Sequence, residues 1–349
     1  MKAFDFFCGG GGLTRGLLDA GIRVVAGFDI CQDFKDTYER NNNVPFICKD
    51  IRDVDETFLF NICPELKTDI RDFLFAGCAP CQPFSQQRKG NTVHKDIFLL
   101  TEFGRLVKLI KPGYLLIENV PGIKDKGKEV FDEFLKTLEQ LGYNYCWKVL
   151  NAKNYGVPQN RRRLVLLASL FCQPEMPPET HGKGRLPYVT VSDTIKKYPP
   201  INAGEECADV PNHKAAGISD MNLERLKYTP IDGGTRTQWP ERLVLKCHKS
   251  KEYTGHTDVY GRMRWNGVAP TLTARCYSIS NGRYGHPEQN RAISLREAAA
   301  LQSFRDDYIF YGSSMASIGR QIGNAVPVKL AYALGCQILK MQESTLCTK

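Results

Sequence analysis

The first thirty residues constrain the fold most strongly, because they alternate between strand-like and helix-like patterns around a run of glycines. Residues 3–7 are apolar and strand-like, four glycines occupy positions 9–12, a helical stretch runs from Leu13 to Ala20, and residues 22–28 form a second apolar run. Gly21 is placed to stop the helix. A strand, a glycine turn, a helix and a second strand make a βαβ unit. The pattern predicts an α/β fold built on a mostly parallel sheet.

The glycine turn also predicts a ligand site. Glycines before a helix N-terminus let a ligand approach the backbone closely, and Asp29, at the end of the second strand, is placed to accept hydrogen bonds from ribose hydroxyls. The spacing differs from the dinucleotide pattern Gly-x-Gly-x-x-Gly, so it favours a nucleoside-type ligand without a pyrophosphate. Asp50, after a short strand at 44–47, could accept the exocyclic amine of an adenine. The alternatives are a purely structural turn for the glycines and a helix cap for Asp50.

A second candidate site follows the strand-like run 72–76, in the sequence Gly-Cys-Ala-Pro-Cys-Gln-Pro-Phe-Ser at 77–85. Prolines on both sides of Cys81-Gln82 stiffen the backbone and present one small side chain. A thiol held there can attack an electrophilic carbon if its surroundings lower its pKa. A buried structural cysteine is the alternative. The following residues, 86–95, are polar and basic, which suggests a loop that closes over a substrate.

Two later strands carry charged residues at their ends. Glu118 ends the apolar run 113–117, where a buried carboxylate is costly without a role or a partner. Arg161 and Arg163 lead into the apolar strand 164–168 and suggest an anion clamp, with a solvated turn as the alternative. The glycines, Cys81, Glu118 and these arginines are expected to converge on one edge of the sheet.

Composition limits the remaining possibilities. A chain of 349 residues exceeds the usual size of a single core, so two domains are expected. A net charge of +9 is a weak indication of a polyanionic partner. The 13 cysteines are odd in number and dispersed, which favours reduced thiols, and no second Cys-x-x-Cys pair completes a zinc site with Cys78 and Cys81. We expect no metal, no membrane span and no signal peptide.

From about residue 174 the strand–helix alternation ends, and short segments rich in Gly, Pro, Asn and His continue to residue 288. Basic residues alternate there with aromatic ones, as on a surface that reads nucleic acid; a solvated face is the alternative. The arginines of interest are Arg236, Arg242, Arg262, Arg264, Arg275 and Arg283.

Taken together, these segments resemble, in order and spacing, the cytosine-C5 DNA methyltransferase family. The matching stretches include Pro80-Cys81-Gln82, Glu118-Asn119-Val120 and Gln159-x-Arg161-x-Arg163, and near the C-terminus residues 296–304 and 321–327. The resemblance implies a Rossmann-like catalytic domain at 1–173, completed by 291–349, and a smaller, irregular β-rich target-recognition domain at 174–290. It also implies that the last helix, from Lys329 to Met341, packs beside the first crossover.

The same resemblance implies the activity and the residues that carry it. The reaction is transfer of a methyl group from S-adenosyl-L-methionine to C5 of a cytosine flipped out of double-stranded DNA, through a covalent bond between Cys81 and C6. The implied catalytic residues are Cys81, Glu118, Arg161 and Arg163. The implied cofactor-binding residues are Phe7, Gly9, Gly11, Gly12, Leu13, Asp29, Ile30, Asp50, Ile51, Pro80, Leu99, Asn324 and Val326.

Further expectations from the resemblance are a monomeric, cytoplasmic enzyme that acts on specific DNA sequences and has a possible companion restriction endonuclease. A tRNA-directed member of the same family would carry the same site and is the main alternative. A second alternative is a DNA-binding protein that has the fold of the family but no catalytic activity. The presence of Cys81, Glu118 and Arg163 argues against this alternative.

Overall fold

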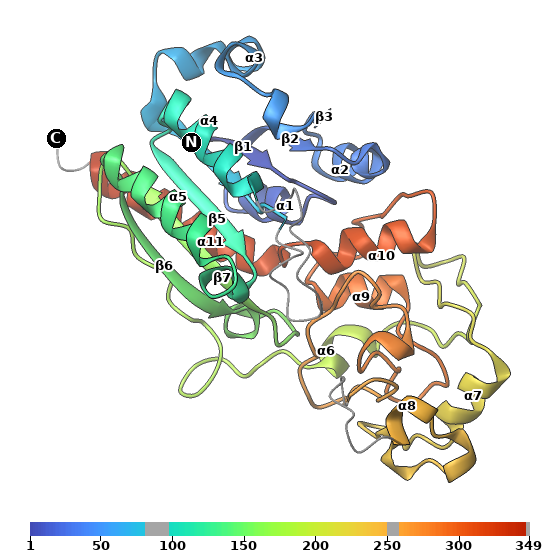
Figure 1. Ribbon diagram of the computed structural model, residues 1–349. Helices are drawn as coiled ribbons and strands as arrows, with labels where there is room; N and C mark the ends of the chain where they lie inside the picture. The colour runs from blue at the N-terminus through green and yellow to red at the C-terminus, as the bar shows by residue number, and fades with distance from the viewer. Residues whose placement is uncertain (81–97, 250–257, 347–349) are drawn as a thin grey trace. The chain divides into compact units, whose positions relative to one another are not determined.

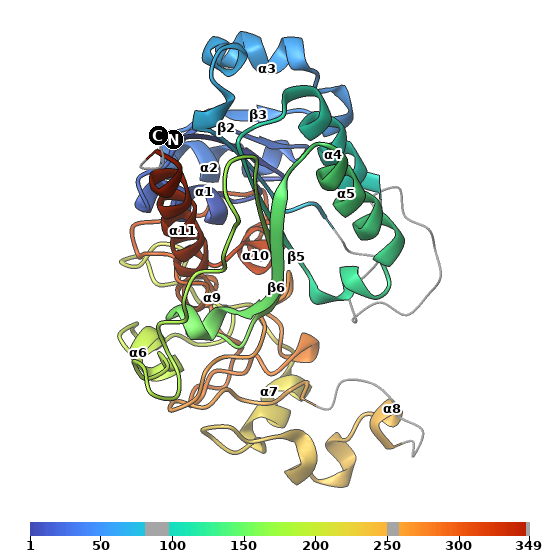
Figure 2. The ribbon, with the colours of Figure 1, turned by 90° about the vertical axis from the view of Figure 1, so that its left-hand side faces the viewer.

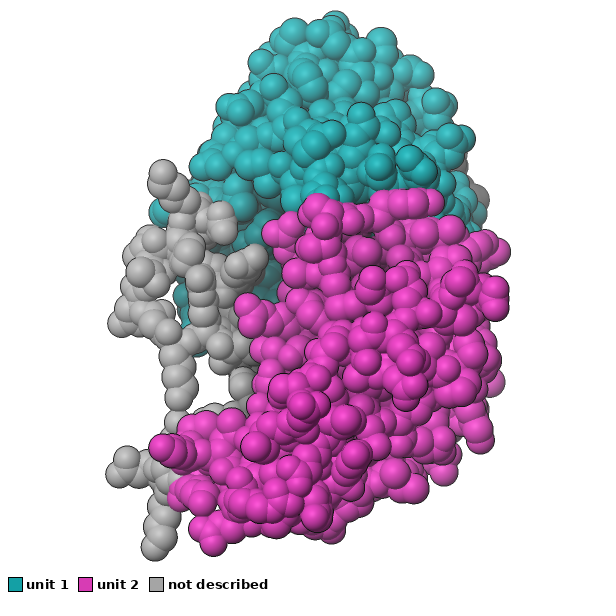
Figure 3. All heavy atoms as spheres, turned by 90° about the vertical axis from the view of Figure 1, so that its right-hand side faces the viewer, with its two compact units in different colours: residues 1–155, 162–180, 326–349 teal, residues 156–161, 181–325 magenta. Residues whose placement is uncertain are grey.

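The computed structural model describes residues 1–80, 98–249 and 258–346 (Figure 1). The chain divides into two compact units (Figure 3). Unit 1 comprises Met1–Tyr155, Arg162–Thr180 and Val326–Lys349, and unit 2 comprises Gly156–Arg161 and His181–Ala325. Unit 2 therefore includes residues 291–325, which the sequence assigned to the catalytic domain.

Unit 1 contains a seven-stranded sheet in the order β3-β2-β1-β4-β5-β7-β6, in which β7 runs antiparallel to both β5 and β6 and the other neighbouring strands pair in parallel. The strand order reverses beside β1, which is the position where open α/β sheets bind ligands. The mixed α/β class with a mostly parallel sheet is confirmed. The strands are β1 (Lys2–Phe6), β2 (Arg23–Asp29), β3 (Phe46–Cys48), β4 (Phe73–Gly77), β5 (Tyr114–Asn119), β6 (Asn144–Asn151) and β7 (Arg162–Ser169).

Helices cover both faces of this sheet. Figure 2 shows α1 and α11 on one face and α4 and α5 on the other. The predicted packing of the last helix beside the first crossover is confirmed, because a Cβ placed on Gly16 of α1 would lie 2.3 Å from the Cβ of Ala331 in α11. The helices of unit 1 are α1 (Gly12–Asp19), α2 (Lys35–Asn42), α3 (Glu56–Ile62), α4 (Leu99–Ile110), α5 (Lys128–Gln140) and α11 (Val328–Leu346).

The core of unit 1 is rich in phenylalanine. Phe4 and Phe6 of β1 contact Phe75 of β4, with ring centroids 5.8 and 5.1 Å apart. Phe6 also lies 5.6 Å from Phe103 of α4, so the sheet and its helical cover share one cluster. Alternate residues of a strand face the same side, which is why positions 4 and 6 bury together while Asp5 faces the opposite side.

Unit 2 is irregular, as expected, but its described residues form isolated bridges rather than the β-rich structure that the sequence suggested. Its loops obtain hydrogen bonds from arginines instead. Arg161, Arg262, Arg291 and Arg296 are each at most 1% exposed. Arg262 alone donates to the carbonyls of Leu226, Thr229, His286 and Gln289 and to the Asn290 side chain.

Such donors are needed because buried carbonyls outside helices and sheets otherwise lack hydrogen-bond partners.

The helices of unit 2 are α6 (Val191–Ile195), α7 (Asp220–Lys227), α8 (Lys246–Lys249), α9 (Leu295–Leu301) and α10 (Met315–Asn324). At the N-terminus of α9, Ser294 and Glu297 form a capping box, in which the side chain of each accepts the other's backbone N–H.

In the described part of the chain, one helical stretch, Met315–Thr345, is long and apolar enough to cross a membrane. It consists of α10 and α11, and 67% of its most apolar window is buried within the protein. A core helix that is mostly buried passes the same test of length and composition, so this stretch is only weak evidence for a membrane span.

Candidate active site

The glycine turn follows β1 and is fastened to the end of β2. Phe7, Gly9 and Gly11 all have positive φ, at 61°, 52° and 84°. Asp29 holds the turn, because its Oδ2 accepts the Gly9 N–H at 3.0 Å while its Oδ1 accepts the Cys31 N–H at 2.9 Å. The carboxylate that was predicted to bind ribose therefore also shapes the turn.

The turn leaves room for a ligand. A Cβ built on Gly9 would meet no atom within 4 Å, and the N-terminus of α1 has neither a side-chain cap nor an acidic residue in its first turn. A helix end of this kind offers N–H groups and a partial positive charge. Beside Asp29, the Ile30 side chain is 67% exposed although it is large and apolar. These features suit a nucleoside-type ligand with an apolar ring.

Asp50 is a helix cap, the alternative that the sequence left open. Its Oδ1 accepts the backbone N–H of Arg52 at 3.0 Å, and the Arg52 guanidinium contacts both carboxylate oxygens. These hydrogen bonds lower the pKa of Asp50. Contact with an adenine amine stays a prediction for Asp50.

The other cofactor candidates of unit 1 lie after strands or at helix starts. Leu13 and Ile51 are buried, Pro80 and Leu99 are partly buried, and Val326 is buried just before α11. Asn324 belongs to unit 2, where it ends α10.

Glu118 forms an ion pair with Arg163 in unit 1. The Arg163 Nε lies 2.8 Å from Glu118 Oε1, and the side chains are only 12% and 8% exposed. Strand direction produces the pair, because β7 runs antiparallel to β5 and aligns Leu164 with Asn119 and Val165 with Glu118. The start of β7 thus lies beside the end of β5.

The ion pair leaves the Glu118 carboxylate incompletely bonded. Although the Arg163 Nε lies close to Glu118 Oε1, that buried oxygen forms no hydrogen bond with any of the described residues. A buried polar atom without a partner is costly and is common where a ligand completes the bonding. Glu118 is therefore available to a further donor.

The segment before Cys81 is anchored next to Glu118. The Cys78 N–H donates to Phe6 O at 3.3 Å, and Asn119 Nδ2 donates to Ala79 O at 3.2 Å. Burial, together with the nearby Glu118 and Asp5 carboxylates, raises the pKa of the Cys78 thiol well above its ordinary value, so this thiol is neutral. Cys81 itself and the basic segment 86–95 lie outside the described residues.

Arg161 has different surroundings from Arg163. It belongs to unit 2, where its guanidinium donates to the carbonyls of Leu272, Gly323 and Ala325 at 2.9–3.0 Å. Gln159 accepts the Leu272 N–H at 2.9 Å and donates to Leu301 O at 3.2 Å. The structure therefore brings Arg163, and not Arg161, to Glu118 within one unit.

Asp5 was not among the predicted site residues, although it lies in β1 next to the glycine turn. It is fully buried; its Oδ2 accepts Thr14 Oγ1 at 2.6 Å, and its Oδ1 has no hydrogen-bond partner among the residues the structure describes. Burial raises the pKa of Asp5 to about 7. An aspartate inside an apolar run, Phe4-Asp5-Phe6, was the available sequence signal.

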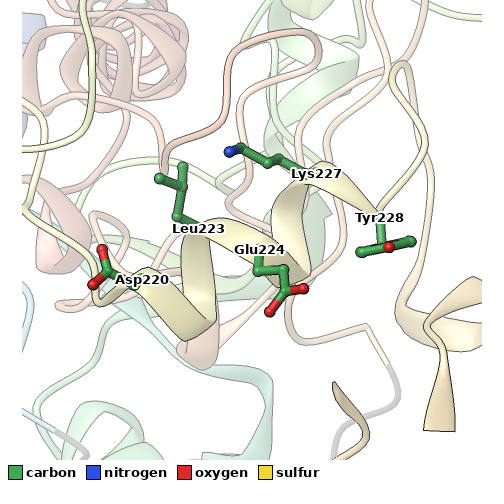
Figure 4. A pocket seen from close by; sticks show the side chains of 5 residues that line it. All are labelled: Asp220, Leu223, Glu224, Lys227 and Tyr228. Carbon is green, nitrogen blue, oxygen red and sulfur yellow. The ribbon is translucent and has the colours of Figure 1, made fainter. Parts of the chain in front are cut away.

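Unit 2 has a hollow of about 570 Å³ on α7 (Figure 4). It is lined by Asp220, Leu223, Glu224, Lys227 and Tyr228, none of which is a predicted site residue. Across the described ranges there is no group of three or more His, Cys, Asp or Glu side chains that could hold a metal ion.

The structure is thus that of an α/β protein whose unit 1 carries, at the carboxyl ends of its central strands, a glycine turn held by Asp29 and the Glu118–Arg163 ion pair. Comparison with known proteins identifies the family. The family model for C-5 cytosine-specific DNA methylase matches residues 1–340. The type II methylase M.HgiDII of Herpetosiphon aurantiacus is 42% identical over 343 residues, which cover 97% of this chain and 95% of that protein.

The type II methyltransferase M1.HphI of Haemophilus parahaemolyticus is 34% identical over 351 residues, which cover 98% of this chain and 87% of that protein. The chain belongs to the C-5 cytosine-specific DNA methylase family and is a DNA cytosine-5 methyltransferase.

Solved structures agree on the fold. A DNA modification methyltransferase encoded within a prophage of E. coli superposes with a TM-score of 0.73 at 21% identity, covering 98% of this chain and 99% of that one. The S. pombe Dnmt2 methyltransferase superposes with a TM-score of 0.63 at 16% identity, covering 98% of this chain and 99% of that one.

Proposed function

We propose that this methyltransferase uses S-adenosyl-L-methionine to methylate C5 of a cytosine flipped out of a specific sequence in double-stranded DNA. The observation that carries the proposal is the Glu118–Arg163 pair, which unit 1 presents at the sheet edge that also bears the glycine turn and Asp29. One edge then holds both a cofactor site and a group able to bind a pyrimidine ring.

The residues of the turn suit this cofactor. Asp29 is the residue proposed to accept hydrogen bonds from the ribose hydroxyls, the open side of Gly9 admits the ligand, and the exposed Ile30 offers an apolar surface to an adenine ring. When bound, S-adenosyl-L-methionine supplies an electrophilic methyl group on a sulfonium sulfur. We include Phe7, Leu13, Ile51, Pro80, Leu99, Asn324 and Val326 in the same proposed site.

Cytosine C5 is a poor nucleophile because it belongs to an aromatic ring. Attack of the Cys81 thiolate on C6 forms an S–C bond and moves a ring electron pair toward C5, which then resembles an enamine. Glu118, sharing a proton with N3 of the base, disperses the charge that develops in the ring. After C5 is alkylated, a base removes the C5 proton and the S–C bond breaks, which restores the aromatic ring and frees Cys81.

In this proposal Arg163 positions Glu118, with which it forms an ion pair, and contacts the carbonyl oxygen of the base, as the family resemblance implies. For Arg161 the structure favours a supporting role, because its guanidinium is bonded to three main-chain carbonyls of unit 2. The basic segment 86–95 is proposed to close on the DNA and exclude water.

Unit 2 is the proposed DNA-reading part, and it contains most of the segment 174–290. The duplex must present its target base out of the stack, because C5 and C6 are inaccessible within it. We further propose a monomer that works in the cytoplasm, with a companion restriction endonuclease of the kind that the type II relatives suggest.

The test is Cys81→Ser, compared with wild type. Wild-type protein is expected to form a covalent adduct with duplexes containing 5-fluorocytosine, since fluorine blocks the elimination step, while the serine variant binds the cofactor but transfers no methyl group. Normal turnover by the variant would exclude the covalent mechanism. Methylation of tRNA in preference to duplex DNA would favour the RNA-directed alternative.

Replacing the segment 174–290 with that of a relative of different specificity tests the role of unit 2. The chimera is expected to methylate the donor's sequence and still to require Cys81. Retention of the original specificity would show that recognition lies elsewhere in the chain.

A further inference from the structure

Burial and bonding separate the six arginines that the sequence marked as candidate DNA contacts. Arg262 is buried among five acceptors, and Arg283 donates to the carbonyls of Gly233, Gly234 and Arg262. Arg236 contacts His248. Arg242 pairs with Glu224 at 2.5 Å. These four have partners inside unit 2, and the side chains of Arg264 and Arg275 are exposed.

Arg264 differs from Arg275 because its side chain packs against the backbone of Gly233, which we call the Gly233 seat. A Cβ built on Gly233 would lie 2.4 Å from Arg264 Cγ and 2.5 Å from its Nε. Gly233 also has φ +101°, a conformation that side-chain-bearing residues rarely adopt. The aliphatic stem of Arg264 therefore rests directly on the main chain of Gly233.

Hydrogen bonds hold the backbone of the Gly233 seat and the backbone on both sides of Arg264. Asp232 N–H donates to Pro287 O at 2.8 Å, and Asp232 Oδ1 accepts the N–H of Trp265, the residue after Arg264, at 2.7 Å. Arg283 donates to Gly233 O at 3.1 Å. On the other side of Arg264, the Met263 N–H donates to Gly285 O at 2.8 Å. Both the backbone of Arg264 and the surface beneath its stem are fixed.

The guanidinium beyond this supported stem has no hydrogen-bond or ion-pair partner in the described parts of the chain, and Arg264 is exposed. A free arginine loses considerable side-chain entropy on binding, and a preorganised one loses less. Preorganisation matters most for a contact that depends on geometry. The bidentate contact of a guanidinium with O6 and N7 of guanine in the major groove is such a contact, whereas a phosphate contact tolerates a mobile charge.

Accepting the proposed function, in which unit 2 reads the duplex, we infer that Arg264, seated on Gly233, reads a guanine in the recognition sequence. The contact requires the planar fork of arginine and not only its positive charge. Arg264 is thus a specificity-determining residue, and Gly233 is the residue that positions it.

The test begins with wild-type protein, whose recognition sequence is found by bisulfite sequencing of DNA from expressing cells. Methyl transfer at subsaturating DNA is then measured on the cognate duplex and on duplexes changed at one base pair each. Arg264→Ala is expected to lower the rate on the cognate duplex about 5- to 150-fold, to leave the rate on one changed duplex unaltered, and so to abolish discrimination at one G·C pair.

Three further variants make the test specific. Arg264→Lys keeps the positive charge but is expected to lose discrimination at the G·C pair, as Arg264→Ala does. Gly233→Ala displaces the stem and is expected to reproduce the defect. Arg242→Ala removes an exposed arginine of the same unit that already has a carboxylate partner, and it is expected to keep wild-type discrimination. Cofactor binding and thermal unfolding report whether each variant is folded.

Several outcomes overturn the inference. A loss that is uniform over all duplexes, with a flatter salt dependence and rescue by Arg264→Lys, identifies a phosphate contact instead. If the Arg264→Ala variant is folded and still discriminates between duplexes as the wild type does, Arg264 does not read a base. Failure of the wild-type protein to methylate any duplex overturns the proposed function and this inference with it, whereas the other outcomes leave the proposed function intact.

Discussion

Asp5 makes the stability of unit 1 depend on pH in a direction opposite to that of most carboxylates. Its side chain is fully buried, and burial raises its pKa from 3.8 to about 7. The folded state therefore retains a proton that the unfolded chain has released between pH 4 and 7. Because the folded state binds more protons in this window, stability falls as pH rises through it and levels off above pH 7.

The size of the effect follows from the size of the shift. Each pH unit of difference corresponds to about 1.4 kcal/mol, so a rise from 3.8 to about 7 corresponds to at most about 4 kcal/mol between pH 4 and pH 8. That is a large part of the free energy of unfolding of a typical domain, which is about 5–15 kcal/mol. The change in unfolding free energy with pH is therefore measurable.

Asp5→Asn removes the charge while keeping an oxygen that can accept the Thr14 hydroxyl. The variant is expected to gain stability relative to wild type as pH rises from 4 to 8, by up to about 4 kcal/mol. Urea unfolding, read from hydrogen–deuterium exchange in the peptide that contains β1, measures unit 1 separately from unit 2. Asp19→Asn, at a partly exposed carboxylate paired with Arg15, is the control.

The reasoning fails if the wild type and Asp5→Asn differ by the same free energy at every pH. Such a constant difference would mean that Asp5 ionises normally in the folded protein. A pH-dependent gain in Asp19→Asn of the same size would show that general charge effects, and not the buried Asp5 carboxyl, cause the slope.

Three other substitutions test the site and the packing. Asp29→Ala is expected to raise the apparent constant for S-adenosyl-L-methionine about 10- to 150-fold, more than that for DNA, because the carboxylate holds Gly9 and is proposed to bind ribose. Titration of the cofactor measures this, and unchanged affinity would show that the site is misplaced. Gly16→Ala is expected to destabilise unit 1 by about 1–3 kcal/mol in urea, since its Cβ would lie 2.7 Å from Val328 O; an unchanged midpoint would refute the close packing. Arg262→Met is expected to cost unit 2 about 3–5 kcal/mol in thermal unfolding because five acceptors lose their donor, while Arg264→Met, at an exposed site, is expected to leave the melting temperature unchanged.

The sequence alone determined the elements whose signals are local. The apolar run of β1, the glycines after it and Asp29 at the end of β2 predicted the first crossover, because strand and helix periodicities and glycine turns depend on neighbouring residues. Glu118 was found in the same way, as a carboxylate at the end of a buried strand. The capping box at Ser294 and Glu297 also depends on residues three positions apart.

Only the tertiary structure decided which distant residues meet. The antiparallel direction of β7 brings Arg163 to Glu118, and strand direction depends on pairing between segments far apart in the chain. Arg161, two residues before Arg163, instead enters the core of unit 2, and Arg262 is buried while Arg264 is exposed. In sequence these arginines look alike. Their surroundings differ because loops without a sheet ladder satisfy their carbonyls with whichever guanidinium the fold places among them.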